Sequence, residues 1–123
     1  MVSQPSNQAL GRLGEQLALE HYERLGFELL ARNHRTRAGE IDLIVRDPRA
    51  LVFVEVKTRR ARGLDPLLAL TALKRRRMRA LAAAWLAEHP DRPHAACLRI
   101  DAVAVVVDER DRLVALEQVE DVA

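Results

Sequence analysis

Apolar residues follow a helical period in the first part of the chain and a strand-like alternation after it. Leucines and alanines recur at steps of three and four over residues 7–25, which predicts an amphipathic helix. Alternation predicts short strands at residues 27–32 and 40–46, joined by an arginine-rich turn at residues 33–39. Residues 51–57 are almost continuously apolar, so we expect them to form a central strand that is covered on both faces.

The second part of the chain predicts one more helix and two more strands. Asp65 can cap a helix that begins at Pro66 and ends before the prolines that follow residue 88. A β-branched run at residues 98–107 predicts a buried strand, and residues 113–119 predict an edge strand. Three strands in a meander, followed by a helical crossover to a parallel strand, give an αβββαβ core. We therefore expect an α/β fold in which residues 1–123 form one domain, with a mixed central sheet flanked by helices.

Composition excludes several classes of protein. The 123 residues are 49% hydrophobic and 31% charged, with a formal net charge of +2, which is typical of a folded globular chain. Cys97 is the only cysteine, which excludes an internal disulfide, and we expect it in the core rather than as a nucleophile. Residues 1–8 lack a secretory pattern and no apolar run is long enough for a bilayer, so we expect a cytoplasmic protein without a membrane partner. The four histidines have no paired helical spacing, so we expect no histidine zinc site.

Charge is concentrated in segments. Residues 57–79 contain nine basic residues and one acid, a net charge of +8, whereas residues 108–123 have a net charge of −4. Such a basic segment favours binding of a polyanion by one surface, although an arginine-rich solvated face explains the same pattern without a partner. In the second helix, Lys74 and Arg77 fall on the apolar stripe, so we expect them to reach a wet cleft or to meet anions.

An acid and a base interrupt the most apolar strand. Successive strand residues point to opposite faces, so Phe53, Glu55 and Lys57 share one face. Ionised groups are costly to bury unless they are paired, bound to a metal or open to water. An ion pair between Glu55 and Lys57 is one explanation, and a functional cleft is the other.

Further carboxylates are predicted to lie beside this strand. A short turn between the strands at residues 40–46 and 51–57 makes a hairpin, which brings Asp42 level with Glu55. Two carboxylates that converge beside an ammonium group repel one another unless a cation lies between them, and oxygen ligands suit a hard ion such as Mg²⁺. Glu15, at the margin of the first helix's apolar stripe, can face the same site, although a surface glutamate is the simpler interpretation.

These residues resemble a known nuclease pattern. Asp42, followed after twelve residues by Glu55-Val56-Lys57 within an αβββαβ order, resembles the PD-(D/E)XK nuclease superfamily, whose core is the restriction-endonuclease-like fold. Ile41 stands where that signature has a proline, which ligates nothing. The chain is most similar to the bacterial YraN family, and archaeal Holliday-junction resolvases are more distantly similar in arrangement. The stretches that carry the YraN resemblance are Gly14-Glu15, Gly26-Phe27, Arg32-Asn33, Gly39-Glu40-Ile41-Asp42-Leu43-Ile44, Leu51-Val52-Phe53-Val54-Glu55-Val56-Lys57-Thr58-Arg59 and Arg99-Ile100-Asp101.

The resemblance implies a metal-dependent nuclease site. It implies that Asp42 and Glu55 ligate Mg²⁺ or Mn²⁺, with the carbonyl of Val56 as a further ligand. Lys57 would orient or deprotonate the attacking water and stabilise charge on the phosphate. Glu15 matches the acid that related resolvases supply from their first helix.

Our hypothesis is hydrolysis of phosphodiester bonds in DNA, including branched substrates of the Holliday-junction kind. A symmetric homodimer suits such a task, but no apolar patch in the sequence demands it. One alternative is a non-catalytic nucleic-acid-binding module that retains the nuclease fold, and another is a subunit whose basic face docks an acidic protein. The enzyme is favoured because carboxylates in an anion cleft repel phosphates when no metal is present. The residues expected to hold phosphates are Arg35, Arg59, Arg60, Arg62, Lys74 and Arg77.

Overall fold

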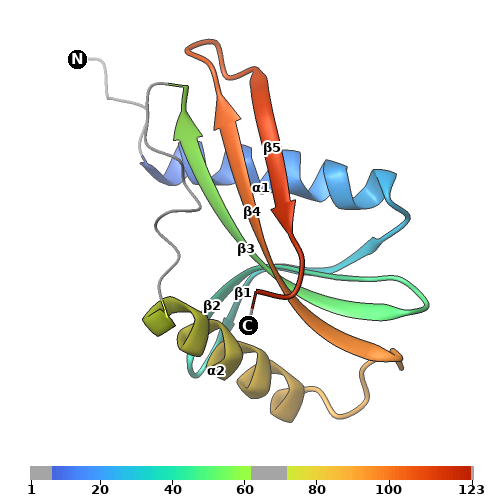
Figure 1. Ribbon diagram of the computed structural model, residues 1–123. Helices are drawn as coiled ribbons and strands as arrows, with labels where there is room; N and C mark the ends of the chain where they lie inside the picture. The colour runs from blue at the N-terminus through green and yellow to red at the C-terminus, as the bar shows by residue number, and fades with distance from the viewer. Residues whose placement is uncertain (1–6, 62–71, 123) are drawn as a thin grey trace.

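The computed structural model describes residues 7–61 and 72–122 (Figure 1). Its elements follow the predicted order of α, β, β, β, α, β and β. No helix in the described part of the chain has the length and apolar character needed to cross a bilayer. The elements are α1 (Asn7–Arg24), β1 (Glu28–Thr36), β2 (Gly39–Arg46), β3 (Ala50–Arg60), α2 (Ala72–Glu88), β4 (Cys97–Val107) and β5 (Leu113–Val119).

The five strands form one mixed sheet in the order β1-β2-β3-β4-β5. β1, β2 and β3 pair antiparallel as a meander, because short turns join them. β4 pairs parallel to β3, because the connection between them passes through α2. β5 returns antiparallel to β4 at the edge of the sheet. The predicted α/β fold, with β3 at the centre of a mixed sheet, is confirmed.

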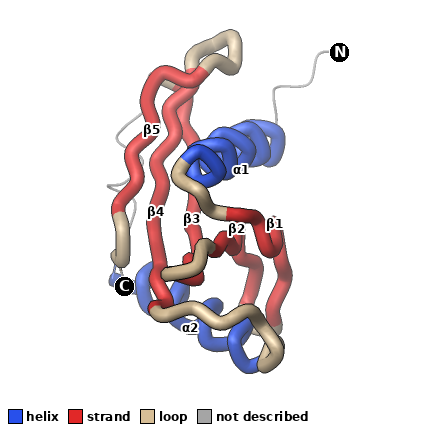
Figure 2. Tube along the Cα trace, turned by 90° about the vertical axis from the view of Figure 1, so that its right-hand side faces the viewer, coloured by secondary structure: helices blue, strands red, loops and turns tan. Residues whose placement is uncertain are grey.

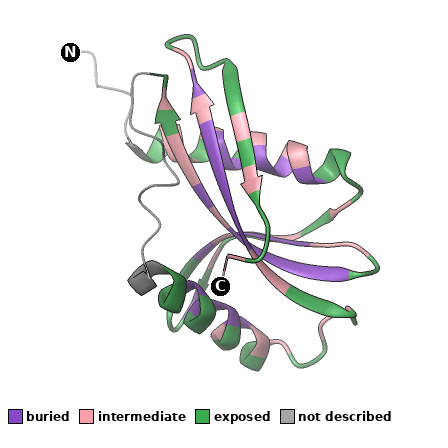
Figure 3. Cartoon of the chain, in the orientation of Figure 1, coloured by how far each residue is buried: buried purple, intermediate pink, exposed green. Residues whose placement is uncertain are grey.

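The two helices pack on opposite faces of the sheet (Figures 1 and 2). Residues alternate between faces along β3, so Val52 and Val54 pack with the α1 side chains, whereas Leu51 and Phe53 pack with those of α2. Figure 3 shows the resulting burial along the first half of β3 and the middle of β4, and the exposure of most of β5. The sheet is therefore buried on both faces where β3 passes between the two helices.

A polar network is buried beneath α1. Asp101 is 0% exposed, and both of its carboxylate oxygens accept hydrogen bonds. Burial and the adjacent carboxylate raise the pKa of the Tyr22 phenol, which keeps its proton for this network. A buried charge is tolerated when a cation and several hydrogen bonds satisfy it. The donors to Asp101 are the Arg99 guanidinium, the Tyr22 hydroxyl, the Gln118 amide and the backbone amide of Asp121.

Two expectations about the strands are corrected. The turn expected at residues 33–39 is much shorter, because β1 continues to Thr36 and pairs with Gly39. β1 is an edge strand, so its arginine side chains can remain exposed and do not end the strand. Cys97 is exposed rather than in the core, because it is the first residue of β4 and lies beyond the cover of the helices.

The helix α2 also departs from expectation at one position. Its buried stripe consists of Met78, Leu81, Ala82 and Trp85. At about 100° per residue, Arg77 lies roughly 90° from the middle of this stripe. Arg77 is therefore exposed and flanks the stripe rather than lying on it. The predicted first turns of this helix, including Asp65, lie outside the described residues.

Candidate functional site

Asp42 lies where the pairing of β2 with β3 stops. The paired residues end at Leu43 and Val54, and extending this register by one residue places Asp42 opposite Glu55. There the Asp42 side chain takes the place of a backbone carbonyl of β2 as the hydrogen-bond partner of β3, because its Oδ2 accepts a hydrogen bond from the Val56 amide at 2.8 Å. The predicted approach of Asp42 to the Glu55 end of β3 is therefore present in the structure.

A small pocket opens beside these two carboxylates. Its volume is about 10 Å³, which is roughly the space for one water-sized probe. Asp42 and Glu55 form part of its wall together with Glu40, while Met78 and Leu81 of α2 supply apolar cover. The carboxylates are therefore only half-buried and within reach of solvent.

A third carboxylate reaches the site from α1. Glu15 is 9% exposed and accepts a hydrogen bond from the side-chain amide of Asn33 at 2.9 Å. α1 lies very close to β3 at this point: a Cβ added to Gly14 would lie 1.7 Å from Oγ1 of Thr58. Glu15 is thus buried toward Asp42, and the simpler interpretation of a surface glutamate is wrong.

Sequence reasoning missed two residues in the surroundings of Glu15. The sequence pattern predicts Asn33 in a turn, but Asn33 lies inside β1 with a left-handed φ of 49°. Thr58 has a buried hydroxyl without a hydrogen-bond partner among the described residues, at the contact with Gly14. An asparagine within an edge strand is the one sequence signal that could have indicated the first of them.

Burial and the negative charge of Glu55 raise the pKa of Asp42 from 3.8 to about 8. The hydrogen bond from the Val56 amide opposes this change, and the Glu15 charge adds to it. None of the ion pairs among the described residues involves any of these three carboxylates. The site therefore gathers negative charge that no described cation compensates.

Lys57 follows Glu55 by two residues on β3 and is half-buried. The described residues contain no ion pair between Glu55 and Lys57 within 4.0 Å. The simple ion pair offered as an alternative explanation of these two residues is therefore not present. Lys57 is not among the residues that line the pocket beside Asp42 and Glu55, and its role stays a prediction.

Comparison with known sequences identifies the family. The model of the family described as "Uncharacterised protein family UPF0102" matches residues 14–105. The chain belongs to this family. UPF0102 is the YraN family, so the resemblance noted in the sequence is confirmed. The matched segment includes all four candidate catalytic residues, Glu15, Asp42, Glu55 and Lys57.

Relatives with the UPF0102 name match most of the chain. A UPF0102 protein of Mycolicibacterium vanbaalenii is 46% identical over 111 residues, which cover 89% of this chain and 90% of the relative. One from Streptomyces griseus is 48% identical over 103 residues, covering 83% and 86%. One from Geobacter metallireducens is 43% identical over 100 residues, covering 80% of each chain. The names of these relatives give family membership and no activity.

The basic residues expected to hold phosphates in this UPF0102 protein are distributed over several elements. Arg35 on β1, Arg59 near the end of β3 and Arg77 on α2 are exposed. Arg62 lies outside the described residues, as does the side chain of Lys74. Arg77 extends toward the β1–β2 turn, since a Cβ on Gly39 would lie 3.7 Å from its Nη2.

Arg60 is occupied by the acidic turn between β4 and β5. Its Nη1 donates to the backbone carbonyl of Asp108 at 2.8 Å and to the carboxylate of Asp111 at 2.6 Å. The acidic tail of the sequence thus neutralises one member of the basic segment within the same chain. Arg60 is less available for phosphate than its exposed neighbour Arg59.

The fold brings together two histidines that the sequence spacing does not relate, and it leaves the expectation of no histidine zinc site untested. His34 and His89 are far apart in the sequence, but the fold brings their rings to a centroid distance of 5.3 Å. With Glu88 they form the only group of three potential metal ligands within the described ranges whose ligand atoms all lie within 4.8 Å of one another. Helical spacing could not reveal this group, because one histidine belongs to β1 and the other follows α2.

Proposed function

We propose that this protein is a divalent-metal-dependent nuclease that hydrolyses phosphodiester bonds in DNA, with Mg²⁺ or Mn²⁺ held by Asp42 and Glu55. The observation that carries the proposal is the meeting of two half-buried carboxylates, with a third nearby, without a described cation to compensate them. Like charges brought together in this way destabilise the folded state unless a ligand offsets their repulsion. A divalent ion is the ligand that this arrangement fits.

The donor set is suited to a hard cation. Carboxylate oxygens of Asp42 and Glu55, with the Val56 carbonyl as a proposed third donor, are the ligands that Mg²⁺ and Mn²⁺ prefer. The pocket provides room for water beside them. When bound, the ion supplies Lewis-acid polarisation of a phosphoryl oxygen and lowers the pKa of a bound water.

The chain's own residues have separate roles in this proposal. Asp42 is oriented by the Val56 amide, which donates a hydrogen bond to one of its carboxylate oxygens. Lys57 donates hydrogen bonds from its ammonium group to the attacking water and to the phosphate oxygen that gains charge. Glu15, held by Asn33, orients water at the margin of the site.

DNA would be held by its phosphates rather than read by its bases. Arg59 and Arg77 are exposed cations on the elements that flank the acidic pocket, and such contacts position a backbone without sequence information. Binding is then expected to weaken steeply as salt rises. Branched DNA is the substrate shape to test first, because the resemblance to junction resolvases favours it.

Cleavage of plasmid DNA and of a four-way junction with Mg²⁺ or Mn²⁺ tests the proposal. Asp42→Asn removes a proposed metal ligand, and Lys57→Ala removes the proposed ammonium donor. Glu117→Gln on the exposed face of β5 is a matched control. We expect metal-dependent cleavage by the wild type and the control, and a loss of about a hundredfold or more in the two site variants.

Two outcomes would oppose the proposal. Cleavage that survives both Asp42→Asn and Lys57→Ala, or that does not need a metal ion, would assign the activity to another site or to a contaminant. Salt-sensitive DNA binding that persists in Asp42→Asn, together with no turnover by the wild type, would favour the non-catalytic binding module.

A further inference from the structure

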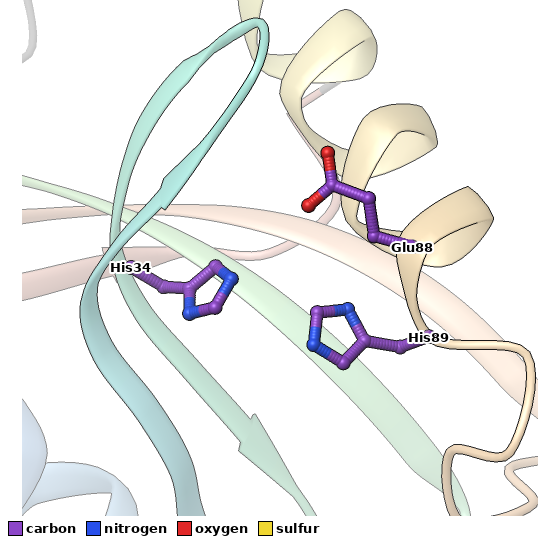
Figure 4. Close-up of side chains that lie close together, drawn as sticks. All are labelled: His34, Glu88 and His89. Atoms are coloured by element: carbon purple, nitrogen blue, oxygen red, sulfur yellow. The ribbon is translucent and has the colours of Figure 1, made fainter.

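A second group of metal-binding side chains lies apart from the acidic pocket. His34 comes from β1, Glu88 is the last residue of α2 and His89 directly follows it (Figure 4). Their ligand atoms all lie within 4.8 Å of one another. None of the three lines the pocket beside Asp42 and Glu55. Two imidazoles and a carboxylate are therefore gathered where β1 meets the end of α2.

His89 is held with one ring nitrogen ready to bind a metal. Its Nδ1 lies 2.9 Å from the Trp85 backbone carbonyl. A carbonyl only accepts hydrogen bonds, so Nδ1 carries the hydrogen and Nε2 keeps its lone pair. The ring also stacks on the Trp85 indole, with a centroid distance of 4.3 Å and an interplanar angle of 15°. Metal-binding histidines are characteristically oriented through the other ring nitrogen in this way.

The other two side chains are held by the β1–β2 hairpin. The half-buried His34 ring meets the His89 ring edge-to-face. Oε2 of Glu88 accepts a long hydrogen bond, 3.4 Å, from the Arg37 backbone amide. A tetrahedral ion with bonds of about 2.0–2.1 Å places its ligands roughly 3.3 Å apart, so small side-chain rotations complete the set. Glu88 is exposed and free to make such a rotation.

A cavity adjoins the three ligands. It has a volume of about 420 Å³, and His34, Glu88 and His89 all belong to its wall. Trp85 lines the same cavity, and its buried indole nitrogen has no hydrogen-bond partner in the described part of the chain. Arg92, also in the wall, is held by the backbone carbonyls of Leu86 and His89 at the end of α2. The cavity leaves room for a water or a small ligand at a fourth coordination position.

We propose that His34, Glu88 and His89 bind a Zn²⁺ ion. Two imidazoles with one carboxylate suit a borderline transition metal, whereas Mg²⁺ prefers a set of oxygen ligands. Three protein ligands beside a cavity correspond to a zinc site that keeps one position open. The ion also links the hairpin that carries Asp42 to the helix that covers the Asp42 pocket. This inference is independent of the proposed nuclease activity.

Zinc titration of the full-length, chelator-stripped protein tests the site. Affinity is measured by competition with a chromophoric chelator, and Co²⁺ absorption reports the coordination number. The variants are His34→Ala, His89→Ala and Glu88→Gln, with the exposed His94→Ala as the matched control and Asp42→Asn to exclude the acidic pocket. Thermal unfolding in chelator shows whether each variant is folded. Glu88→Gln decides the test if a histidine variant fails to fold, because Glu88 is exposed.

We expect one equivalent of Zn²⁺ to bind to Asp42→Asn, in which the acidic pocket is disabled, and we expect the histidine site to bind Zn²⁺ in the wild type and in His94→Ala as well. Loss of an outer-shell hydrogen bond already weakens metal binding by about 10–100-fold, so loss of a ligand histidine should weaken it by at least about a hundredfold. Glu88→Gln should also weaken binding. Absence of zinc binding by the wild type, unchanged affinity in the folded ligand variants, or loss of binding in Asp42→Asn would each overturn the proposal.

Discussion

The substitution Asp42→Asn should make the metal-free protein more stable while it removes metal binding. The amide is close in shape to the carboxylate, and its Oδ1 can still accept the hydrogen bond from the Val56 amide. Its NH₂ group can donate to the Glu55 carboxylate, which the Asp42 carboxylate repels. A gain in stability on substitution of a proposed catalytic residue indicates that the charged groups of the site are arranged to bind a cation rather than to stabilise the metal-free protein.

The raised pKa of Asp42 sets the size and the pH dependence of this gain. A pKa of about 8 in the folded state, against 3.8 in the reference state, corresponds at about 1.4 kcal/mol per unit to an upper limit of about 6 kcal/mol. The pocket is open to water and Glu55 can rotate away, so we expect about 2–3 kcal/mol. The pKa of Asp42 is higher in the folded state than in the unfolded state. The stability that protonated Asp42 contributes is therefore fully present below about pH 4 and is lost by about pH 8.

Urea unfolding of both proteins, followed by circular dichroism, measures this difference. In chelator the curves should coincide near pH 4, and the advantage of Asp42→Asn should grow until about pH 8 and then stay constant. Added Mg²⁺ at about 100 times its Kd should stabilise the wild type by about 2.7 kcal/mol and leave Asp42→Asn unchanged. The reasoning is refuted if Asp42→Asn is the less stable protein in chelator above pH 7, or if Mg²⁺ stabilises both proteins equally.

Four further substitutions test the surroundings of the site. Asp101→Asn, at the fully buried aspartate beneath α1, should destabilise the protein by roughly 3 kcal/mol in the same urea assay, because this carboxylate already has a cationic partner. A gain in stability would contradict this contrast with Asp42. Gly14→Ala should cost about 1–3 kcal/mol, because its Cβ would lie 1.7 Å from Oγ1 of Thr58, and a double-mutant cycle with Thr58→Ala should recover part of that cost. Arg59→Ala should reduce the salt dependence of DNA binding, measured by fluorescence anisotropy, by about one unit of slope. Arg60→Ala should change that slope less, because Asp111 already pairs with this arginine. An effect equal to that of Arg59→Ala would argue against this difference between the two arginines.

Much of the fold was predictable because it depends on local patterns. β5 occupies the predicted residues 113–119, and the parallel pairing of β3 with β4 followed from the intervening helix. The approach of Asp42 to Glu55 was predictable because the turn between their strands is short. Asp47 fixes that turn, since its carboxylate accepts hydrogen bonds from the amides of Arg49 and Ala50.

The features that sequence reasoning missed depend on contacts between distant segments. Glu15 is buried because Gly14 lets α1 approach Thr58, and no pattern within either segment reveals that contact. The left-handed conformation of Asn33, which holds Glu15, occurs inside a strand rather than in a turn. His34 and His89 meet only because the β1–β2 hairpin reaches the end of α2. Local periodicity determines the elements, whereas side-chain convergence across elements depends on how closely they pack.

A crystal of the protein soaked in Mn²⁺ tests the central claim most directly. Anomalous scattering locates the ion without reference to any assay of activity. The account predicts an anomalous peak between the carboxylates of Asp42 and Glu55, with the Lys57 ammonium group close to the metal's water ligands. A structure in which this position stays empty at saturating Mn²⁺, or in which the two carboxylates point apart, would contradict it.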